Sequence, residues 1–458
     1  MDVSRLRNER VSVIGAARSG VAVARLLQTS GARVFVSDRD PEEKLVPKGG
    51  KSPLPLLAQA GIPYELGGHT DRVYDCSLMV ISPGVPSNAP VVREAQTRAL
   101  KVVSEVEVAS WFCPDSVGIV AITGSNGKTT TTTLVGRILG DAKKKHAVAG
   151  NIGTAFSSVV LDLASSDIAV LEVSSFQLDH CETFRPKIAI IMNITQNHMD
   201  RYDNSMELYA ASKARIFMNQ SGNDALIYDA DDTWTSKAVS TARCRTIPFS
   251  IQRILEEGAF VENGMLVTVS NGKRSDIIKT DQISIRGPHN LYNAMAATLT
   301  GQLLGVGTAS IRATLKNFKG VEHRQEFVRE VNGVRYYNDS KATSVEAVWY
   351  ALQAFEQPIV LMLGGRDKGN DYSRIVDLVR NNVRGIIAIG ESAEKVEKAF
   401  SSYITVKRAN AMDEAVLLAQ STAQPGDVVL LSPACASFDW FEDYEQRGMV
   451  FKELVKHL

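Results

Sequence analysis

The sequence predicts an α/β protein of two or three domains, and three observations lead to this prediction. The chain has 458 residues, whereas single hydrophobic cores stop growing at about 250–300 residues. Short apolar runs alternate with amphipathic stretches almost throughout, as in strand–helix–strand units with parallel sheets. Breaks at 113–115 and 318–320 interrupt the alternation. We therefore predict domains at 1–110, 111–319 and 320–458.

Composition narrows the class of protein. Lys plus Arg and Asp plus Glu both number 51, so the net charge is zero. A neutral chain argues against nucleic acid or an anionic membrane as the main partner. The basic run at 143–145 is interpreted as a solvated surface turn. No stretch reaches the ~18 apolar residues of a membrane span, and no long apolar segment precedes the first short strand.

The number and spacing of the cysteines indicate the kind of compartment in which the protein works. There are five, an odd number, and none forms a C-x-x-C pair. This pattern argues against a disulfide framework or a zinc site and favours a reducing compartment. We therefore expect a cytoplasmic protein. The five are Cys76, Cys113, Cys181, Cys244 and Cys435.

The N-terminal segment reads as a strand–helix–strand unit. Strands are predicted at 11–15, 32–38 and 78–84, a helix at 20–30, and the stretch 101–112 leads out of the unit. The glycine-rich turn GAARSG at 15–20 resembles a dinucleotide fingerprint, but Ala17 replaces its second glycine. Asp38 stands about 20 residues on, where it could bond a ribose. The turn therefore predicts a Rossmann-like domain that takes a nucleotide-like diphosphate, and it disfavours NAD.

The strongest signal is ITGSNGKTT, whose first two residues, 122 and 123, end a strand predicted at 117–123. Gly124 and Gly127 would let backbone N–H groups approach a polyphosphate at the start of the following helix. Lys128 would reach the β- and γ-phosphates, and Thr129 would hold Mg²⁺ through its hydroxyl. Only two residues separate the glycines, so the loop is shorter than the common P-loop. We predict a central ATP-binding domain of the P-loop ATPase type.

Other polar residues follow the strands of the central segment, predicted at 168–173 and 188–194. Glu172 ends the first of these and suits Mg²⁺, although a structural cap is an equal alternative. His198 follows the second; a lone histidine is more often structural, but a position next to the Glu172 strand favours a functional role. Lys213 lies on an amphipathic helix, where a solvated charge is the ordinary interpretation. Antiparallel hairpins are expected from 247 to 285 and a helix from 290 to 305.

Two asparagines, Asn290 and Asn293, share one face of that last helix because they lie three residues apart. That face could meet a nucleotide, while Asn290 could equally be a helix cap.

The C-terminal segment carries three polar clusters at strand ends. Strands are predicted at 333–339, 358–365, 385–390 and 427–433, and ligands of open α/β sheets bind at such carboxyl ends. The clusters are NDSKATS at 338–344, GGRDKG at 364–369 and SPACASFDWF at 432–441. Three basic residues would attract phosphate or carboxylate groups, namely Arg324, Lys341 and Lys368. Cys435 has no obvious partner, so we interpret it as a small buried residue rather than a nucleophile.

Together these motifs resemble those of the Mur ligase family over nearly the whole chain. In chain order they are ITGSNGKTT, GN at 150–151, LEVSSFQL, NITQNHMDRY, the lysine of ASKAR, GPHNLYN, EHR at 322–324, NDSKATS, GGRDKG and SPACASFD. Within the family, the GAARSG loop, the SPG turn at 82–84 and the last segments resemble the members that add D-glutamate. The resemblance implies an ATP-dependent ligase that joins D-glutamate to UDP-N-acetylmuramoyl-L-alanine through an acyl phosphate in peptidoglycan synthesis.

The resemblance also implies roles for individual residues. The catalytic residues are Lys128, His198 and Lys213. The ATP site comprises Gly124, Ser125, Asn126, Gly127, Lys128, Thr129, Thr130, Asn290, Asn293, Arg324, Asp339 and Lys341. The ligands of two Mg²⁺ ions are Thr129, Glu172, His198 and a carbamylated Lys213. The UDP-substrate residues are Arg18, Ser19, Asp38, Ser82, Gly84, Asn151, Gln177 and His198, and those for D-glutamate are His198, Thr343, Lys368, Ser437 and Phe438.

Some positions depart from the family pattern. Ser344 stands where Asn is frequent, Tyr444 where Phe is frequent and Phe438 where an aliphatic residue is frequent, and the loop at 39–55 is long. We expect a monomer that acts on small molecules. The alternatives are a folylpolyglutamate-type ligase, a P-loop ATPase switch, an NAD-dependent dehydrogenase or a nucleotide-binding module without catalysis.

Overall fold

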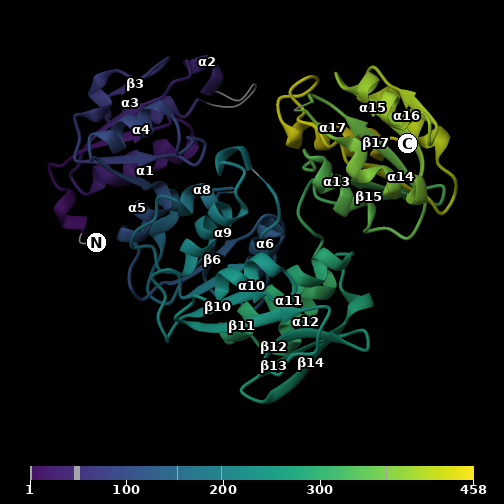
Figure 1. Ribbon diagram of the computed structural model, residues 1–458, viewed down its shortest axis with the longest axis horizontal. Helices are drawn as coiled ribbons and strands as arrows, with labels where there is room; N and C mark the ends of the chain where they lie inside the picture. Colours follow the sequence, from purple (N-terminus) through teal and green to yellow (C-terminus); the bar gives the residue numbers. More distant parts are fainter. Residues whose placement is uncertain (1–2, 46–51, 152, 198, 368) are drawn as a thin grey trace. The chain divides into compact units, whose positions relative to one another are not determined.

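The computed structural model describes residues 3–45, 52–151, 153–197, 199–367 and 369–458. It contains three β-sheets, and helices pack on each of them (Figure 1). The described residues divide into two compact units, Met1–Gln282 with Tyr292–Lys316, and Ile283–Leu291 with Asn317–Leu458. The predicted boundaries at 110 and 319 remain predictions. Among the described helices, none is both long and apolar enough to cross a membrane.

The first sheet is parallel and has the strand order β3-β2-β1-β4-β5. The three central strands, β1, β2 and β4, are almost wholly buried, as expected where helices cover both faces of a sheet. The strands are β1 (Arg10–Ile14), β2 (Arg33–Ser37), β3 (Tyr64–Glu65), β4 (Leu78–Ile81) and β5 (Lys101–Ser104). The helices are α1 (Arg18–Thr29), α2 (Glu42–Leu45), α3 (Leu54–Gln59), α4 (Pro90–Thr97) and α5 (Glu105–Phe112).

The stretch 101–112 has two elements that the sequence did not separate. Its first residues form β5 and pair with β4, and the chain then leads on to the next segment. The remainder forms α5, which Ser104 caps by accepting a hydrogen bond from the Glu107 N–H. A valine pair followed by a capping serine reads equally well as one helix or as a strand with a helix after it.

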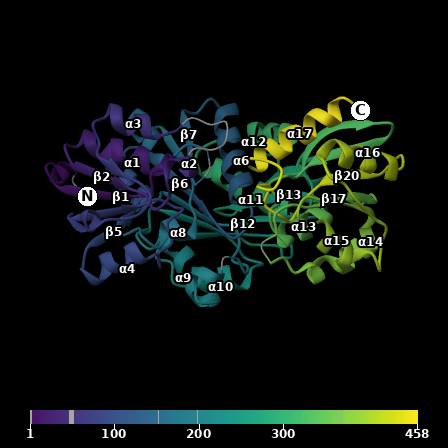
Figure 2. The same cartoon turned by 90° about the horizontal axis from the view of Figure 1, so that it is seen from above.

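The central sheet has nine strands in the order β14-β13-β12-β11-β10-β9-β6-β8-β7. Its strands are β6 (Gly118–Thr123), β7 (His146–Gly150), β8 (Ile168–Glu172), β9 (Ile188–Ile191), β10 (Ala225–Asp229), β11 (Arg245–Ser250), β12 (Gly258–Glu262), β13 (Met265–Ser270) and β14 (Lys273–Lys279). Its helices are α6 (Lys128–Asp141), α7 (Phe156–Val159), α8 (Ser175–Leu178), α9 (Met206–Ala214), α10 (Thr233–Val239), α11 (Pro288–Leu303) and α12 (Thr308–Asn317). Figure 2 shows α9 and α10 on one side of this sheet and α6 on the other.

The hairpins predicted in this region are partly confirmed. β12, β13 and β14 are antiparallel, and left-handed residues at Asn263–Gly264 and Asn271–Gly272 form their turns. β11 is different, because it runs parallel to both β10 and β12 and belongs to no hairpin. The lysine run 143–145 lies between α6 and β7 and includes left-handed Lys143, as a surface turn would.

The second unit carries a six-stranded sheet in the order β15-β16-β20-β17-β18-β19, parallel except for β15. The strands are β15 (Glu326–Val331), β16 (Val334–Asn338), β17 (Ile359–Gly364), β18 (Val383–Ile389), β19 (Val406–Arg408) and β20 (Val428–Leu431). The helices are α13 (Val345–Leu352), α14 (Val376–Asn382), α15 (Ala393–Phe400), α16 (Met412–Thr422) and α17 (Tyr444–Lys456). Short 3-10 turns complete the fold: η1 (Val3–Leu6), η2 (Asp71–Tyr74), η3 (Val160–Asp162), η4 (Met199–Arg201), η5 (Arg215–Phe217), η6 (Thr280–Gln282) and η7 (Tyr372–Ile375).

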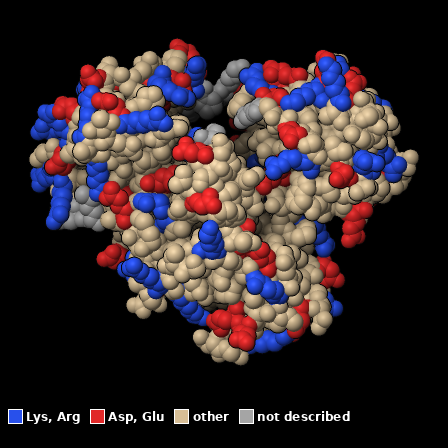
Figure 3. All heavy atoms as spheres, viewed as in Figure 1, with Lys and Arg blue, Asp and Glu red and all other residues tan. Residues whose placement is uncertain are grey.

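The predicted α/β class and the strands named in advance for this last segment are confirmed. On the face drawn in Figure 3, basic and acidic side chains are interspersed, in keeping with the zero net charge.

Candidate active site

A glycine turn joins β6 to α6 at the carboxyl end of the central sheet. Gly124 and Gly127 have φ of 149° and 83°, a region that side-chain-bearing residues rarely adopt. At Gly127 a Cβ would also lie 2.5 Å from Asn293 Oδ1. Asn293, on α11, accepts a hydrogen bond of 3.1 Å from the Thr131 hydroxyl of α6. The predicted glycine turn is confirmed, and Asn293 lies directly against it.

Residues after β9 hold the turn in place. The amides of Ser125 and Asn126 donate to the backbone oxygen and to Oδ1 of Asn193, each over 2.9 Å. The Ser125 hydroxyl donates to the Thr195 carbonyl over 2.8 Å. The first amides of a helix have no partner within the helix, so those at the start of α6 are the natural donors to a phosphate.

Two lysines converge on one carbonyl oxygen of the turn. Lys128 Nζ lies 2.7 Å from Gly124 O and 2.9 Å from Ser125 O, and Lys213 Nζ lies 2.9 Å from Gly124 O. Lys213 is 1% exposed, so the interpretation as a solvated charge was wrong. Burial and the positive charge of Lys128 hold the pKa of Lys213 well below its ordinary value. Both causes favour the neutral form of the Lys213 amine.

A buried carboxylate lies beside the start of α6. Glu172, at the end of β8, accepts from the Thr129 hydroxyl over 2.8 Å and from the Asn151 amide over 3.0 Å. Glu172 thus connects α6, which follows the glycine turn between β6 and α6 (the phosphate turn below), to the loop after β7. Its carboxylate and the Thr129 hydroxyl are oxygen donors of the kind that Mg²⁺ prefers. Within the described ranges, no group of three or more His, Cys, Asp or Glu side chains could hold a metal ion.

Gln177 shows an unmatched donor near this loop. Its Oε1 accepts from the Ser174 amide and hydroxyl, which closes a capping box at α8. Its Nε2 is buried and finds no partner among the residues that the structure describes. A buried amide donor left without an acceptor indicates a place where a ligand oxygen fits.

The N-terminal sheet carries a cavity of about 1090 Å³ at the carboxyl ends of its strands. Six residues predicted for the UDP substrate line it: Arg18, Ser19, Asp38, Ser82, Gly84 and Asn151. Asp38 accepts from the Ala16 and Asp40 amides, so part of its function is to hold the glycine turn. A Cβ on Gly20 would lie 1.7 Å from Gly15 O, which explains that glycine. The structure therefore brings the predicted N-terminal residues together around one cavity.

In the second unit, Asp339 follows β16 and is 4% exposed. It accepts from the Ser432 hydroxyl over 2.7 Å and from the Gln325 amide over 3.2 Å. Burial raises the pKa of Asp339 to about 7, although the Ser432 hydrogen bond and the Arg324 charge act against that rise. Asp339 therefore joins the turn after β16 to the end of β20.

Other predicted residues of this unit surround the same loops. Lys341 Nζ lies 5.5 Å from the Tyr444 ring centroid. Ser437 is buried, Phe438 is exposed, and Thr343 follows Lys341 in the turn before α13. Asn290 lies within the first turn of α11 and not at its cap position, so the helix-cap interpretation was wrong. Its side-chain amide donates to the Arg286 carbonyl over 2.7 Å and holds the chain before the helix. His198 and Lys368 lie outside the described residues, and their predicted roles remain predictions.

Two further side chains of this unit, Cys435 and Arg447, are buried. Cys435 is buried, and the Asn370 amide donates to its Sγ, so its interpretation as a small buried residue is confirmed. Arg447 on α17 was missed, because a helical arginine in the sequence gives no sign of burial. It is 1% exposed and donates from Nε to Ser340 Oγ, from Nη2 to Ser340 O and from Nη1 to Cys435 O.

Further residues at the N-terminal cavity and the phosphate turn were also missed. Asn193 holds the turn, yet nothing in its motif distinguished it from a loop asparagine. Arg39 and His69 line the N-terminal cavity, and burial lowers the pKa of His69. No local pattern marks them, because tertiary structure alone brings them to the cavity.

Comparison with known proteins agrees with this geometry. Family models described as the MurD N-terminal domain, the Mur ligase middle domain and the Mur ligase glutamate ligase domain match residues 10–91, 122–301 and 323–435. The chain is 46% identical to a UDP-N-acetylmuramoylalanine–D-glutamate ligase from Salinibacter ruber and 45% identical to one from Chloroherpeton thalassium, with full coverage of each pair. In fold it resembles a crystal structure of the UDP-N-acetylmuramate–alanine ligase MurC from Thermotoga maritima, with a TM-score of 0.62, 18% identity and coverage of 98% and 99%.

Proposed function

The chain belongs to the Mur ligase family, and we propose that it joins D-glutamate to UDP-N-acetylmuramoyl-L-alanine at the expense of ATP. The observation that carries this proposal is the arrangement of the glycine turn, where Lys128 and buried Lys213 meet at Gly124 O beside buried Glu172. Full-length identity above 40% to D-glutamate ligases supports the substrate assignment.

In the proposed reaction, the γ-phosphate of ATP passes to the alanine carboxylate, which forms an acyl phosphate and leaves ADP. The amine of D-glutamate then loses a proton and attacks the acyl carbon, an amide bond forms, and phosphate departs. Lys128 and the amides at the start of α6 stabilise negative charge on the phosphoryl group as it moves. The N-terminal cavity holds the uridine diphosphate, and Asn151, which lines it and also bonds Glu172, leads from that cavity to the phosphate turn.

Magnesium fits the residues at this site. Thr129 and Glu172 would supply oxygen ligands, and water and phosphate oxygens would complete the shell, as Mg²⁺ commonly requires. When bound, Mg²⁺ supplies positive charge to the phosphate oxygens. A second ion and the ligand role of His198 remain predictions.

We also propose that Lys213 is carbamylated. An uncharged amine can add to CO₂, forming an N–C bond and a carboxylate with release of one proton, whereas an ammonium group cannot. The lowered pKa of Lys213 supports this step. The resulting carboxylate would lie among Gly124, Glu172 and Lys128, where a cation ligand is useful.

The test uses the purified full-length chain with ATP, Mg²⁺, UDP-N-acetylmuramoyl-L-alanine and D-glutamate. Phosphate release together with a product one glutamyl residue heavier is expected. Lys128→Ala should lower the rate about 100-fold or more, whereas Arg137→Ala, an exposed arginine of the same helix, should not. Phosphate release that needs no amino acid would favour an ATPase switch, and release with L-glutamate but not D-glutamate would refute the stereochemical assignment.

Three proposed properties lie outside this test. The monomeric state, the cytoplasmic location and the D-glutamate contacts of Thr343 and Ser437 remain predictions.

A further inference from the structure

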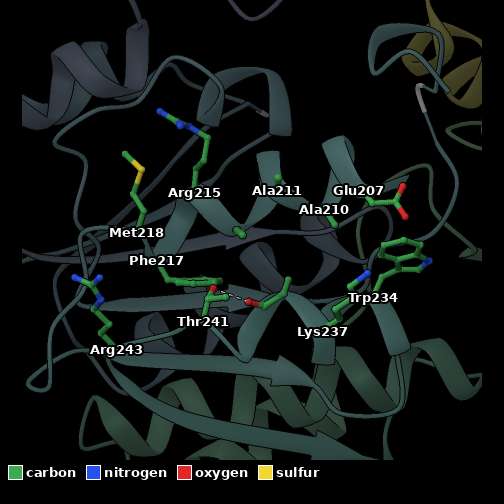
Figure 4. Close-up of a pocket in the computed structure, with 12 residues that line it drawn as sticks. Glu207, Ala210, Ala211, Arg215, Phe217, Met218, Trp234, Lys237, Thr241 and Arg243 are labelled. Atoms are coloured by element: carbon green, nitrogen blue, oxygen red, sulfur yellow. Dashed lines mark hydrogen bonds between the residues drawn. The ribbon is translucent and has the colours of Figure 1, made fainter. Parts of the chain in front are cut away.

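A groove on the first unit lies apart from the site described above. It runs along α9, η5 and α10, and its cavity volume is about 580 Å³. This volume falls within the range of about 300–1000 Å³ that is usual for small-molecule sites. Figure 4 shows its lining side chains projecting from the two helices and from the turn after α9. The ASKAR motif supplies Ala211, Ala214 and Arg215 to its lining, but the role that the motif implies concerns Lys213 alone.

The floor of the groove is apolar. Ala210, Ala211 and Ala214 on α9 leave room that larger side chains would fill, and buried Phe217 closes the bottom. Half-buried Trp234 on α10 forms one wall. A flat apolar body therefore finds both space and an aromatic surface here.

The rim of the groove is basic. In Figure 4, Arg215 and Arg243 lie on the side of Met218, and Lys237 lies with Trp234 on the other. Arg215 donates to the carbonyl oxygens of Leu178 and Cys181, which do not neutralise its charge.

The other charged side chains at the rim also give it an excess of positive charge. Lys237 Nζ lies 4.9 Å from the Trp234 ring centroid. Arg243 is exposed and forms no ion pair with any described residue. Glu207 is the one carboxylate among the residues that line the groove. Positive charge above an apolar floor favours an anion with an apolar body.

We propose that this groove is a binding site for a small amphipathic organic anion. Its apolar body would pack on Ala211, Phe217 and Trp234, and its carboxylate or sulfonate would lie beside exposed Arg243 at the rim. The site is on the outer face of α9, whose inner face carries buried Lys213. The proposal does not depend on the ligase activity.

The test titrates the full-length chain with 8-anilinonaphthalene-1-sulfonate, an aromatic anion whose fluorescence rises in apolar sites. We expect a saturable component that decanoate displaces and that decylammonium, of equal chain length and opposite charge, does not. Arg243→Glu should weaken this component about tenfold or more. Ala211→Leu, which keeps helix propensity and fills the floor, should remove it.

The control is Lys273→Glu, an exposed charge reversal on β14 of the same unit, which should leave the component unchanged. Thermal unfolding checks that each variant is folded. The absence of a saturable component, equal affinity in Arg243→Glu and the parent, or equal displacement by decylammonium would each overturn the proposal. The larger N-terminal cavity can bind the probe, but that component persists in both groove variants and is subtracted.

Discussion

Replacing Arg447 by methionine tests how the two loops assigned to D-glutamate are held. The guanidinium group connects them, because it donates to Ser340 in one loop and to the Cys435 carbonyl in the other. Methionine has a similar length and no donor. The replacement therefore leaves both loops without their shared partner while it keeps most of the packing.

The magnitude follows from the three lost hydrogen bonds. A buried acceptor left unsatisfied costs about 1–3 kcal/mol. Ser340 Oγ still donates to the Tyr444 carbonyl over 2.8 Å, which limits its loss. Burying the guanidinium is itself unfavourable, as its pKa, lowered to about 10 by burial, indicates. We therefore expect about 2–3 kcal/mol, or roughly 30- to 150-fold in the opening equilibrium of the loops.

Hydrogen exchange followed by mass spectrometry measures this opening directly. Peptides covering 338–344 and 432–441 should exchange faster by that factor, whereas peptides from β1 to β5 should not change. The KM for D-glutamate should rise. Arg380→Met is the matched control, since this exposed arginine on α14 lies outside both loops and its replacement should leave their exchange and the KM unchanged. Exchange of both loops within threefold of the parent, with an unchanged KM, would refute this reasoning.

Three further predictions concern the phosphate turn and the pH dependence. Gly127→Ala should weaken ATP binding at least tenfold in a nucleotide titration, because the left-handed backbone costs about 1–2 kcal/mol and the new Cβ meets Asn293; unchanged affinity would show that the turn tolerates a side chain. Glu172→Gln should reduce phosphate release about 100-fold with little change in the unfolding temperature, and a rate within threefold of the parent would contradict its proposed role. Asp339 has a folded pKa of about 7, above its unfolded value near 3.9, so its contribution to stability is full below pH 4 and falls as pH rises to 7, by at most about 1.4 kcal/mol per unit. Urea unfolding should show a weaker decline in Asp339→Asn, and identical pH profiles would falsify the assignment.

The phosphate turn could be predicted from sequence because its constraint is local. A strand, two glycines and a Lys-Thr helix start adjoin in the chain, and the positive φ angles at Gly124 and Gly127 are what such a turn needs. The Asn-Gly turns were predictable for the same reason. The N-terminal cavity was partly predictable, since the residues that end parallel strands gather at one edge of a sheet.

The remainder depends on contacts that are distant in the chain. Lys213 looks like a surface lysine, and only the packing of α9 against the turn buries it. Strands β7 and β10 were not predicted, and the parallel pairing of β11 with β12 cannot be read from periodicity. Arg447 makes three hydrogen bonds to two loops. Ser340 is 107 residues away in the chain and Cys435 is 12 residues away, so no local sequence pattern predicts these contacts.

The nine-stranded sheet ends at β14 and β7, and basic side chains lie on or beside both of these edge strands. An open edge is a template on which another strand can pair. β14 carries Lys273, Arg274, Asp276 and Lys279, which give this edge an excess of positive charge. Arg312 also donates to the carbonyl oxygens of Asp276 and Ile277, so part of the strand is already covered. β7 follows directly after the lysine run 143–145, whose positive charges disfavour the approach of another strand to this edge. We therefore expect the basic residues at both edges to disfavour aggregation of copies of the chain through strand pairing.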